Sequence, residues 1–293
     1  MSIAITTPTG HIGSRLTEKL LDAGAEVTLL ARNPDKVAAF AARGAKVLQG
    51  SLEDEAFVVE ATRGARALFW LTPPNFQTPD FRAYQRHLGA IAAKAIGAND
   101  IQRVVHLSSV GAQLGWGAGP VNGLHDIEKA INAVASNVTH LRPGAFMENA
   151  LMSLDTIKTA GAVFMPVSGD SRVPMVATRD IASAAAGILL DQAWSGVRTT
   201  TLYGPRELGY NDVAATLSEV LGKPVAHVRV TPEQARDAML AMGLTADMAG
   251  QYLELYESFD TGRITQGLPT EPDLRGETTF ETFARTVVKP LIG

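Results

Sequence analysis

The sequence predicts an α/β protein in which a doubly wound parallel sheet is followed by a smaller α+β lobe. Three observations support this prediction. Short apolar strands alternate with helices over the first 150 residues, a glycine-containing turn follows the first strand, and the regular alternation ends near residue 150. Strict alternation of this kind is typical of a parallel sheet covered on both faces by helices. Right-handed crossovers between such strands produce the doubly wound layout.

The first half of the chain supplies the strands of the expected sheet. Residues 2–6 form an apolar run that predicts the first strand. Residues 12–23 then carry apolar side chains at helical spacing, including Ile12, Leu16 and Leu20. The same alternation continues downstream. Further strands are predicted over residues 26–31, 46–49, 66–71, 103–107 and 138–141, and helices over residues 34–43, 53–62, 81–97 and 121–135.

The second half of the chain is less regular and predicts the smaller lobe. Helices are expected over residues 179–190, 210–221, 232–242 and 246–258, and strands over residues 199–202 and 225–230. We therefore expect a boundary near Ala150. Residues 1–150 would form the sheet domain and residues 151–293 the second lobe, with some of its segments returning to the first sheet.

Composition excludes several classes of function. The 293-residue chain has a net charge of −4, with 26 Lys and Arg against 30 Asp and Glu, so nothing predicts binding to nucleic acid or to a membrane surface. The absence of cysteine removes disulfides, thiolate metal sites and cysteine nucleophiles. No apolar run approaches the roughly 18 residues of a membrane span, and the N-terminus lacks a signal-peptide pattern. We expect a cytoplasmic monomer or homodimer.

The turn after the first strand, TTPTGHIG over residues 6–13, is a candidate dinucleotide-binding turn. In such a turn the pyrophosphate binds at the N-terminus of the following helix, where free N–H groups and the helix dipole favour an anion. Gly10 and Gly13 keep the positions of the last two glycines, but Thr7 replaces the first one. Because threonine adopts a positive φ only at a cost, we expect a turn of a different shape. Phosphate contacts are then expected from the N–H groups of Thr9, His11 and Ile12. A glycine pair also occurs in turns that bind no cofactor, but here the pair opens a βαβ unit.

The end of the second predicted strand indicates which cofactor is preferred. An acid about 20 residues after the glycines would hold the ribose hydroxyls of NAD(H). This strand instead ends in Arg32, with Lys36 one helical turn later. A guanidinium can stack on adenine and bind a 2′-phosphate, so we predict NADP(H) in preference to NAD(H). Asp35 could reverse this preference, and Arg32 could also be a solvated charge.

Several motifs taken together resemble those of a known family. TPTGHIG (residues 7–13), ARNPDK (31–36), RVVHLSSVGA (103–112) and HLRPGAFMEN (140–149) occur in this order. Residues 175–225 continue the likeness, which covers nearly the whole chain. The set is similar to the NmrA-like branch of atypical short-chain dehydrogenases/reductases. The resemblance implies a Rossmann domain and a small substrate lobe with the site between them. The family's activities are NAD(P)H-dependent quinone reduction, aromatic ether or isoflavone reduction, and nucleotide sensing without turnover.

The resemblance also places further residues at the site. Thr72 and Pro73 follow the fourth predicted strand and are expected to line the cofactor cleft, while residues 52–54 approach the adenine. Pro143, in the LRPG segment, is expected beside the nicotinamide. Phe146 would then close one side of the substrate pocket.

Two of these segments leave structural alternatives open. In the LRPG segment, Arg142 could instead be an ion-pair partner, with the following Pro-Gly a plain turn. The glycine-rich loop GAQLGWGAGPVNG, residues 111–123, carries Trp116 as a candidate substrate contact. This loop could be a mobile flap over the cleft or a disordered surface loop.

The candidate catalytic residues depart from the usual pattern. Short-chain reductases use a serine after the fifth strand and a Tyr-x-x-x-Lys pair on the next helix. Ser108 is in place, but the spaced pair here is His125 and Lys129, so a histidine replaces the tyrosine. Side chains four residues apart share a helix face, so the lysine can contact the cofactor while its partner donates a proton. An imidazole held charged by Glu128 or Asp126 could do this near neutral pH. Alternatively, the pair is ordinary helix surface.

The remaining histidines do not predict a metal site. His106, His140 and His227 lie in or beside predicted strands without metal-ligand spacing. We therefore expect each of these side chains to be a core residue or to have its hydrogen bonds satisfied.

The predicted function is that of an NADPH-dependent oxidoreductase. Its expected acceptor is a small aromatic or quinoid molecule, because hydride transfer to a quinone tolerates the loss of the tyrosine better than reduction of an ordinary ketone. A first alternative is a regulator that binds NADP(H) and senses redox state without turnover. A nucleotide-sugar epimerase or dehydratase shares the fold but would lack its usual tyrosine.

Overall fold

The computed structural model describes residues 1–292 and contains an eight-stranded parallel sheet. Its strands are β1 (Ser2–Thr6), β2 (Glu26–Ala31), β3 (Lys46–Gln49), β4 (Ala67–Trp70), β5 (Arg103–Leu107), β6 (Val138–Pro143), β10 (Val197–Tyr203) and β13 (Leu274–Arg275). They lie in the order β13-β10-β6-β5-β4-β1-β2-β3, and every neighbouring pair is parallel. This confirms the predicted doubly wound sheet.

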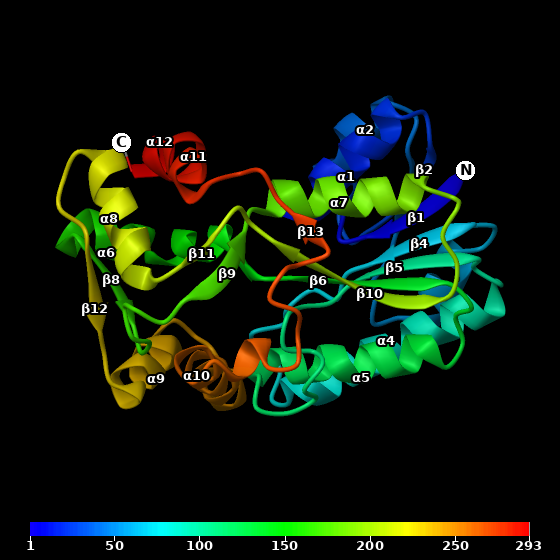
Figure 1. Cartoon of the computed structure of the whole chain (residues 1–293). Coiled ribbons are helices and arrows are strands. Elements are labelled where there is room, and N and C mark those ends of the chain that lie inside the picture. The colour runs from blue at the N-terminus through cyan, green and yellow to red at the C-terminus, as the bar shows by residue number, and fades with distance from the viewer. Residues whose placement is uncertain (293) are drawn as a thin grey trace.

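Helices cover both faces of the sheet, as an all-parallel sheet requires. They are α1 (His11–Asp22), α2 (Ala38–Ala42), α3 (Glu55–Ala61), α4 (Phe81–Ala98), α5 (Asn122–Asn132) and α7 (Thr178–Leu190). Helices α1 and α7 lie together on one face, and α4 and α5 on the other (Figure 1). Leu16 and Ile181 are fully buried on the first face, and Leu88 and Ile127 on the second. The apolar stripe of each helix therefore faces a strand surface that is also apolar.

The sheet contains a point where the strand order reverses. From β1 the chain runs outward through β2 and β3, and it then returns to β4 and continues through β5 and β6 on the other side. Ligands of open parallel sheets bind in the crevice that forms at this point, outside the carboxyl ends of the strands. The turn that follows β1 lies there.

A second lobe is built from two small sheets and several helices (Figure 1). Strands β7 (Ala145–Phe146), β9 (Val173–Val176) and β11 (Glu207–Leu208) form one sheet, and β8 (Ala162–Met165) and β12 (Ala226–Arg229) form the other. The helices are α6 (Leu154–Ala160), α8 (Tyr210–Leu221), α9 (Pro232–Ala241), α10 (Ala246–Asp260), α11 (Phe280–Phe283) and α12 (Lys289–Ile292). The chain returns to the large sheet through β10 and β13, and α7 packs on α1.

Most predicted elements agree with the structure to within a few residues, and the differences have local causes. Helix α3 begins at Glu55, two residues later than predicted, because the Asp54 carboxylate accepts a hydrogen bond from the Phe57 N–H and caps the helix. Helix α5 begins at Asn122 after a short 3₁₀ turn, Gly119–Val121. Strands β7, β8, β9, β11 and β13 were not predicted, because runs of two to four residues show no clear period. In the described part of the chain, no helix combines the length and apolar character needed to cross a bilayer.

Candidate functional site

A cavity of about 840 Å³ opens at the point where the strand order reverses, and we call it the polar cavity. It extends from the turn after β1 to the ends of β2 and β4. The predicted cofactor residues that line it are Thr7, Thr9, Gly10, His11, Ile12, Arg32, Lys36 and Pro73. Segments that are well separated within the first 75 residues of the sequence therefore meet at one edge of the sheet.

The turn after β1 corrects one expectation. Thr7 adopts a φ of +52°, so it takes the left-handed conformation that a glycine would usually supply. The Gly10 N–H donates to the Thr7 carbonyl at 3.2 Å and closes the turn. A Cβ on Gly13 would clash with that same carbonyl oxygen, whereas one on Gly10 would lie 3.7 Å from it. The expectation that Thr7 changes the shape of the turn is therefore wrong, and Gly13 supplies the close packing of helix on strand.

The N-terminus of α1 presents donors to this cavity. Its first N–H groups have no partner within the helix, and its cap residue, Gly10, provides no side-chain hydrogen bond. The first turn of the helix contains no acidic residue that would compete for these donors. Thr7 Oγ1 is buried and has no hydrogen-bond partner among residues 1–292. These features fit a nucleotide diphosphate, because free N–H groups and the helix dipole stabilise an anion.

The far end of the polar cavity carries the charged side chains. Arg32 and Lys36 are exposed and line it, but Asp35 is not among the lining residues. Sequence reasoning missed Tyr84 of α4, which lines this end beside Glu53. Burial and the nearby Glu53 carboxylate raise the pKa of Tyr84 to about 12, although the Arg32 guanidinium acts in the opposite direction. This hydroxyl is thus a donor at neutral pH, and no short motif in α4 indicated it.

A second cavity, of about 560 Å³, lies between the ends of β5 and β6 and the second lobe, and we call it the apolar cavity. No charged side chain of residues 1–292 lines it. Its wall includes a set of methionines: Met147, Met152, Met165, Met175, Met239 and Met242. Phe146, predicted to close the substrate pocket, lines this cavity and also the polar one, as does Asn149. The two cavities are therefore adjacent and share one wall.

Ser108 is held away from both cavities by a buried ion pair. Its Oγ donates to Glu128 Oε1 at 2.5 Å, and Arg142 donates to both Glu128 oxygens at 2.9 and 2.5 Å. Burial alone would raise the pKa of Glu128, but the hydrogen bonds and charge of Arg142 outweigh it, and the pKa is lowered. The interpretation of Arg142 as an ion-pair partner is confirmed. The hydroxyl of Ser108 is already used in this cluster.

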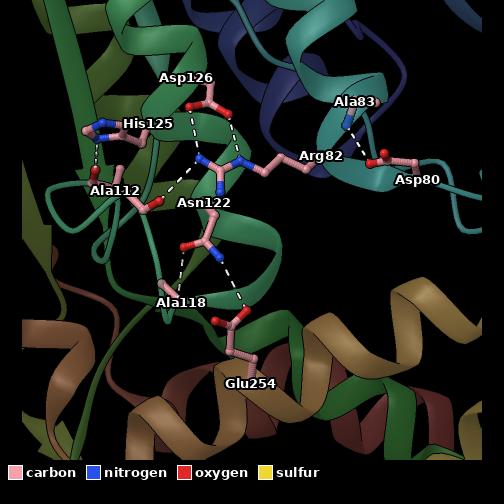
Figure 2. Close-up of polar contacts among 10 residues, drawn as sticks. Asp80, Arg82, Ala83, Ala112, Ala118, Asn122, His125, Asp126 and Glu254 are labelled. Atoms are coloured by element: carbon pink, nitrogen blue, oxygen red, sulfur yellow. Dashed lines mark hydrogen bonds and ion pairs between the residues drawn. The ribbon is translucent and has the colours of Figure 1, made fainter.

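His125 also makes structural contacts (Figure 2). Its Nδ1 lies 2.8 Å from the Ala112 carbonyl oxygen, while Asp126 forms an ion pair with Arg82. Because Glu128 binds Arg142 and Asp126 binds Arg82, neither neighbouring carboxylate forms a hydrogen bond with the imidazole in residues 1–292, and a charged His125 stays a prediction. Lys129 is exposed, and neither His125 nor Lys129 lines the polar or the apolar cavity. The geometry therefore lends no support to a catalytic role for this pair, which stays a prediction.

The remaining predicted contacts lie outside both linings. Gly13 packs on the turn, and Thr72 accepts a hydrogen bond from Trp70 Nε1 at 3.0 Å. Pro143 is buried at the end of β6. Trp116 is 62% exposed, with the Arg263 guanidinium 5.4 Å from its ring centroid. None of these four is among the cavity-lining residues of the described chain.

The glycine-rich loop of residues 111–123 is packed against α10. Asn122 accepts from the Ala118 N–H at 3.1 Å and donates to Glu254 at 3.3 Å (Figure 2). The Gly119 N–H donates to the same Glu254 carboxylate at 3.1 Å, and a Cβ on Gly119 would clash with the Gln251 carbonyl. The structure therefore gives this loop defined contacts with α10, while its movement as a flap stays a prediction.

Two histidines form a buried pair between β5 and β6, in the core as predicted. The Nδ1 atoms of His106 and His140 lie 3.0 Å apart, and His140 Nε2 lies 2.9 Å from Asn132 Oδ1. His140 must therefore donate through Nε2 and accept through Nδ1, which makes His106 the donor of the pair. Burial lowers the pKa of His106 to about 3 and that of His140 to about 4, so both are neutral at pH 7. His106 Nε2 is left as a buried acceptor without a partner among residues 1–292.

Comparison with known proteins agrees with this architecture. The model of the NmrA-like family matches residues 1–284. The chain belongs to the NmrA-like family. It is 30% identical to an NAD(P)H azoreductase of Xenophilus azovorans, over 97% of this chain and 96% of that protein. It is 28% identical to quinone oxidoreductase 2 of Escherichia coli, over 91% and 89% of the two chains.

Solved structures share the fold. Triphenylmethane reductase from Citrobacter sp., complexed with NADP(H), superposes with a TM-score of 0.81 at 20% identity, covering 96% of this chain and 98% of that one. The quinone oxidoreductase QOR2 of Escherichia coli, complexed with NADPH, gives a TM-score of 0.76 at 23% identity, with coverage of 96% and 98%. At this level of identity the likeness establishes the common fold, and the site must be argued from its own residues.

Proposed function

We propose that this NmrA-like protein is an NADPH-dependent oxidoreductase that reduces a quinone or another conjugated, uncharged acceptor. The observation that carries the proposal is the shared wall. Phe146 and Asn149 separate a cavity shaped for a dinucleotide from a cavity without charged side chains. A donor and an acceptor molecule bound in the two cavities would therefore meet at this wall.

The residues that would hold the cofactor follow from the polar cavity. The N–H groups at the start of α1 would bind the diphosphate, with Thr7 Oγ1 as a further donor. Arg32 and Lys36 would bind a 2′-phosphate, which supports the choice of NADPH over NADH. When bound, the cofactor supplies a hydride. The names of the relatives, an NAD(P)H azoreductase and a quinone oxidoreductase, agree with this chemistry.

The acceptor is inferred from what the apolar cavity lacks. Ser108 is engaged by Glu128, and His125 and Lys129 lie outside the lining, so the usual serine–tyrosine–lysine arrangement does not face this cavity. An ordinary ketone needs an acid as it is reduced, because the charge that develops on its oxygen is localised. A quinone spreads that charge over its ring system. It gains one hydride and one proton and becomes a hydroquinone, and water can supply the proton.

Steady-state kinetics test the proposal. Purified protein is mixed with NADPH and a panel of neutral quinones and enals, and the loss of NADPH absorbance is followed against samples without enzyme. We expect turnover with at least one quinone and a lower KM for NADPH than for NADH. Absence of turnover across the panel would contradict the proposal. Calorimetry that then showed tight binding of one cofactor redox state would support the sensing alternative.

A further inference from the structure

Three tyrosines are among the uncharged polar side chains that line the apolar cavity, together with Ser109, Asn149, Ser153, Thr156 and Gln234. Tyr210 begins α8, while Tyr252 and Tyr256 lie on α10, and all three line the cavity. The three side chains are half-buried, and their hydroxyl groups, which bond no other residue of 1–292, are accessible from the cavity. A tyrosine hydroxyl in such a position pairs with water or with a ligand. An acceptor group bound in the cavity can therefore take the place of water at these hydroxyls.

The three hydroxyls belong to one cluster. Tyr252 and Tyr256 are four residues apart on one face of α10, with ring centroids 6.1 Å apart. Burial raises the pKa of Tyr210 and of Tyr256. The nearby Tyr252 raises the pKa of Tyr256 further, and Tyr256 in turn raises that of Tyr210. Burial likewise raises the pKa of Tyr252. All three groups thus stay protonated at neutral pH and can donate hydrogen bonds.

Contacts on both supporting helices hold the cluster in place. Glu254, which lies between Tyr252 and Tyr256 in α10, binds the Gly119 N–H and the Asn122 side chain of the glycine-rich loop. The Tyr210 ring stacks on His227 of β12, with centroids 5.7 Å apart. The donors are therefore positioned before any ligand arrives, which lowers the entropy cost of binding.

We propose that Tyr210, Tyr252 and Tyr256 form a neutral hydrogen-bonding subsite for an uncharged oxygen or nitrogen acceptor on a ring substrate. The inference rests on the proposed function and narrows its substrate class. A carbonyl oxygen of an extended ring system accepts hydrogen bonds from two of the hydroxyls, while its rings contact the methionines of the wall. An anionic analogue is rejected, because no cationic side chain of residues 1–292 lines the cavity and burying an unpaired charge is costly. The enzyme thus selects neutral ring carbonyls and excludes sulfonated ones.

Equilibrium binding tests the subsite without any turnover. Three matched probes are titrated in the presence of NADP⁺: 1,4-naphthoquinone, naphthalene, which has the rings without the oxygens, and 1,4-naphthoquinone-2-sulfonate, which adds a negative charge. We expect the quinone to bind more tightly than naphthalene. A Tyr252→Phe/Tyr256→Phe double variant should reduce that preference roughly tenfold, since each hydrogen bond contributes modestly. Naphthalene should bind the wild type and the variant equally, and the sulfonate should bind neither.

Controls separate this inference from a folding defect and from the proposed function. Tyr203→Phe removes a buried tyrosine hydroxyl outside the cavity lining and should leave all three affinities unchanged. Tyr210→Phe provides a second variant if the double variant melts early. If the variants keep the wild-type preference for quinone over naphthalene, or if the sulfonate binds as well as the neutral quinone, the subsite is overturned even where NADPH oxidation is measured. A lost preference without any turnover would support the subsite and contradict the proposed function.

Discussion

The two cavities are built from the chain in different ways. The polar cavity depends on the backbone of one short turn and on charged side chains at strand ends, most of them within the first 84 residues. The apolar cavity draws its wall from side chains scattered between Ser109 and Phe280. A turn is formed by consecutive residues, so its glycines allow it to be recognised in the sequence. A cavity wall of methionines and aromatics looks like ordinary core until tertiary packing leaves a space beside it.

The largest expected effect comes from the two glycines of the turn. Gly13→Ala should destabilise the protein by about 3 kcal/mol and lower NADPH-dependent turnover roughly 100-fold, because its Cβ would displace the Thr7 carbonyl. Gly10→Ala has room for its Cβ, so it should leave the fold intact and weaken only NADPH binding. Urea unfolding and NADPH titration of both variants measure this contrast. Equal stability of the two variants would show that close packing at Gly13 does not shape the polar cavity.

The buried histidine pair lines neither cavity, so acid should act on stability and not on cofactor choice. The pKa of His106 is about 3 and that of His140 about 4 in the folded protein, against about 6.5 when unfolded. Between these values the unfolded chain binds more protons, so stability is complete above pH 6.5 and falls as the pH is lowered. We expect a loss of about 2 kcal/mol per histidine at pH 5.

Two measurements check this pH dependence. Urea unfolding at pH 7.5 and pH 5 gives the change in stability, and an exposed His87→Gln control should show the same change as the wild type. Imidazole resonances followed by NMR report directly on the pair. If either His106 or His140 titrated near pH 6.5 in the folded protein, the assignment of a neutral pair would be wrong.

Charge at the far end of the polar cavity should set cofactor preference. Arg32→Glu replaces a candidate phosphate partner with a like charge, so the Kd for NADPH should rise roughly 10- to 100-fold while that for NADH changes little. Asp35→Ala is the matched control, since Asp35 does not line the cavity and its loss should alter neither Kd. If the ratio of the Kd values for NADPH and NADH is unchanged in Arg32→Glu, Arg32 does not determine cofactor preference.

The smallest expected effect is at the strained position of the turn. A Cβ in the left-handed conformation of Thr7 costs roughly 1–2 kcal/mol, and Thr7→Gly removes this cost. The glycine also increases the conformational entropy of the unfolded chain, which offsets part of the gain in stability. We expect stability to rise by about 0.5–1 kcal/mol and NADPH binding to weaken a few-fold through the loss of Oγ1. Chemical unfolding and NADPH titration give both numbers, and tighter binding by the glycine variant would exclude a role for the hydroxyl.

Sequence reasoning predicted the large sheet because its strands are apolar, regularly spaced and separated by helices with clear periodicity. It located most of the polar cavity for the same reason, since Gly10 and Arg32 follow strands whose ends meet at one edge. Tyr84 escaped notice because a single tyrosine in a helix carries no motif. The tyrosine cluster of the apolar cavity lies in helices whose packing depends on long-range contacts.

The predicted catalytic residues show the limit of spacing arguments. His125 and Lys129 keep the four-residue interval of the family pattern, but a helix position does not fix which partner a side chain takes. The Ala112 carbonyl binds His125, and Arg142, on the strand β6 that follows α5, draws Glu128 and with it Ser108 into a buried cluster. Hydrogen bonds of this kind, between residues of successive elements, depend on how the helix packs on the sheet, which residue spacing does not reveal.

The wall formed by Phe146 and Asn149 has an evolutionary consequence. Among residues 1–292, Phe146 and Asn149 line both cavities, and Glu148, Leu151 and Thr178 are the other residues of the C-terminal half that line the polar one. Substitutions at the remaining positions of the apolar cavity can therefore change its shape without altering the wall of the polar cavity. Such a division lets one cavity diverge among descendants of an ancestral chain while the other is inherited unchanged.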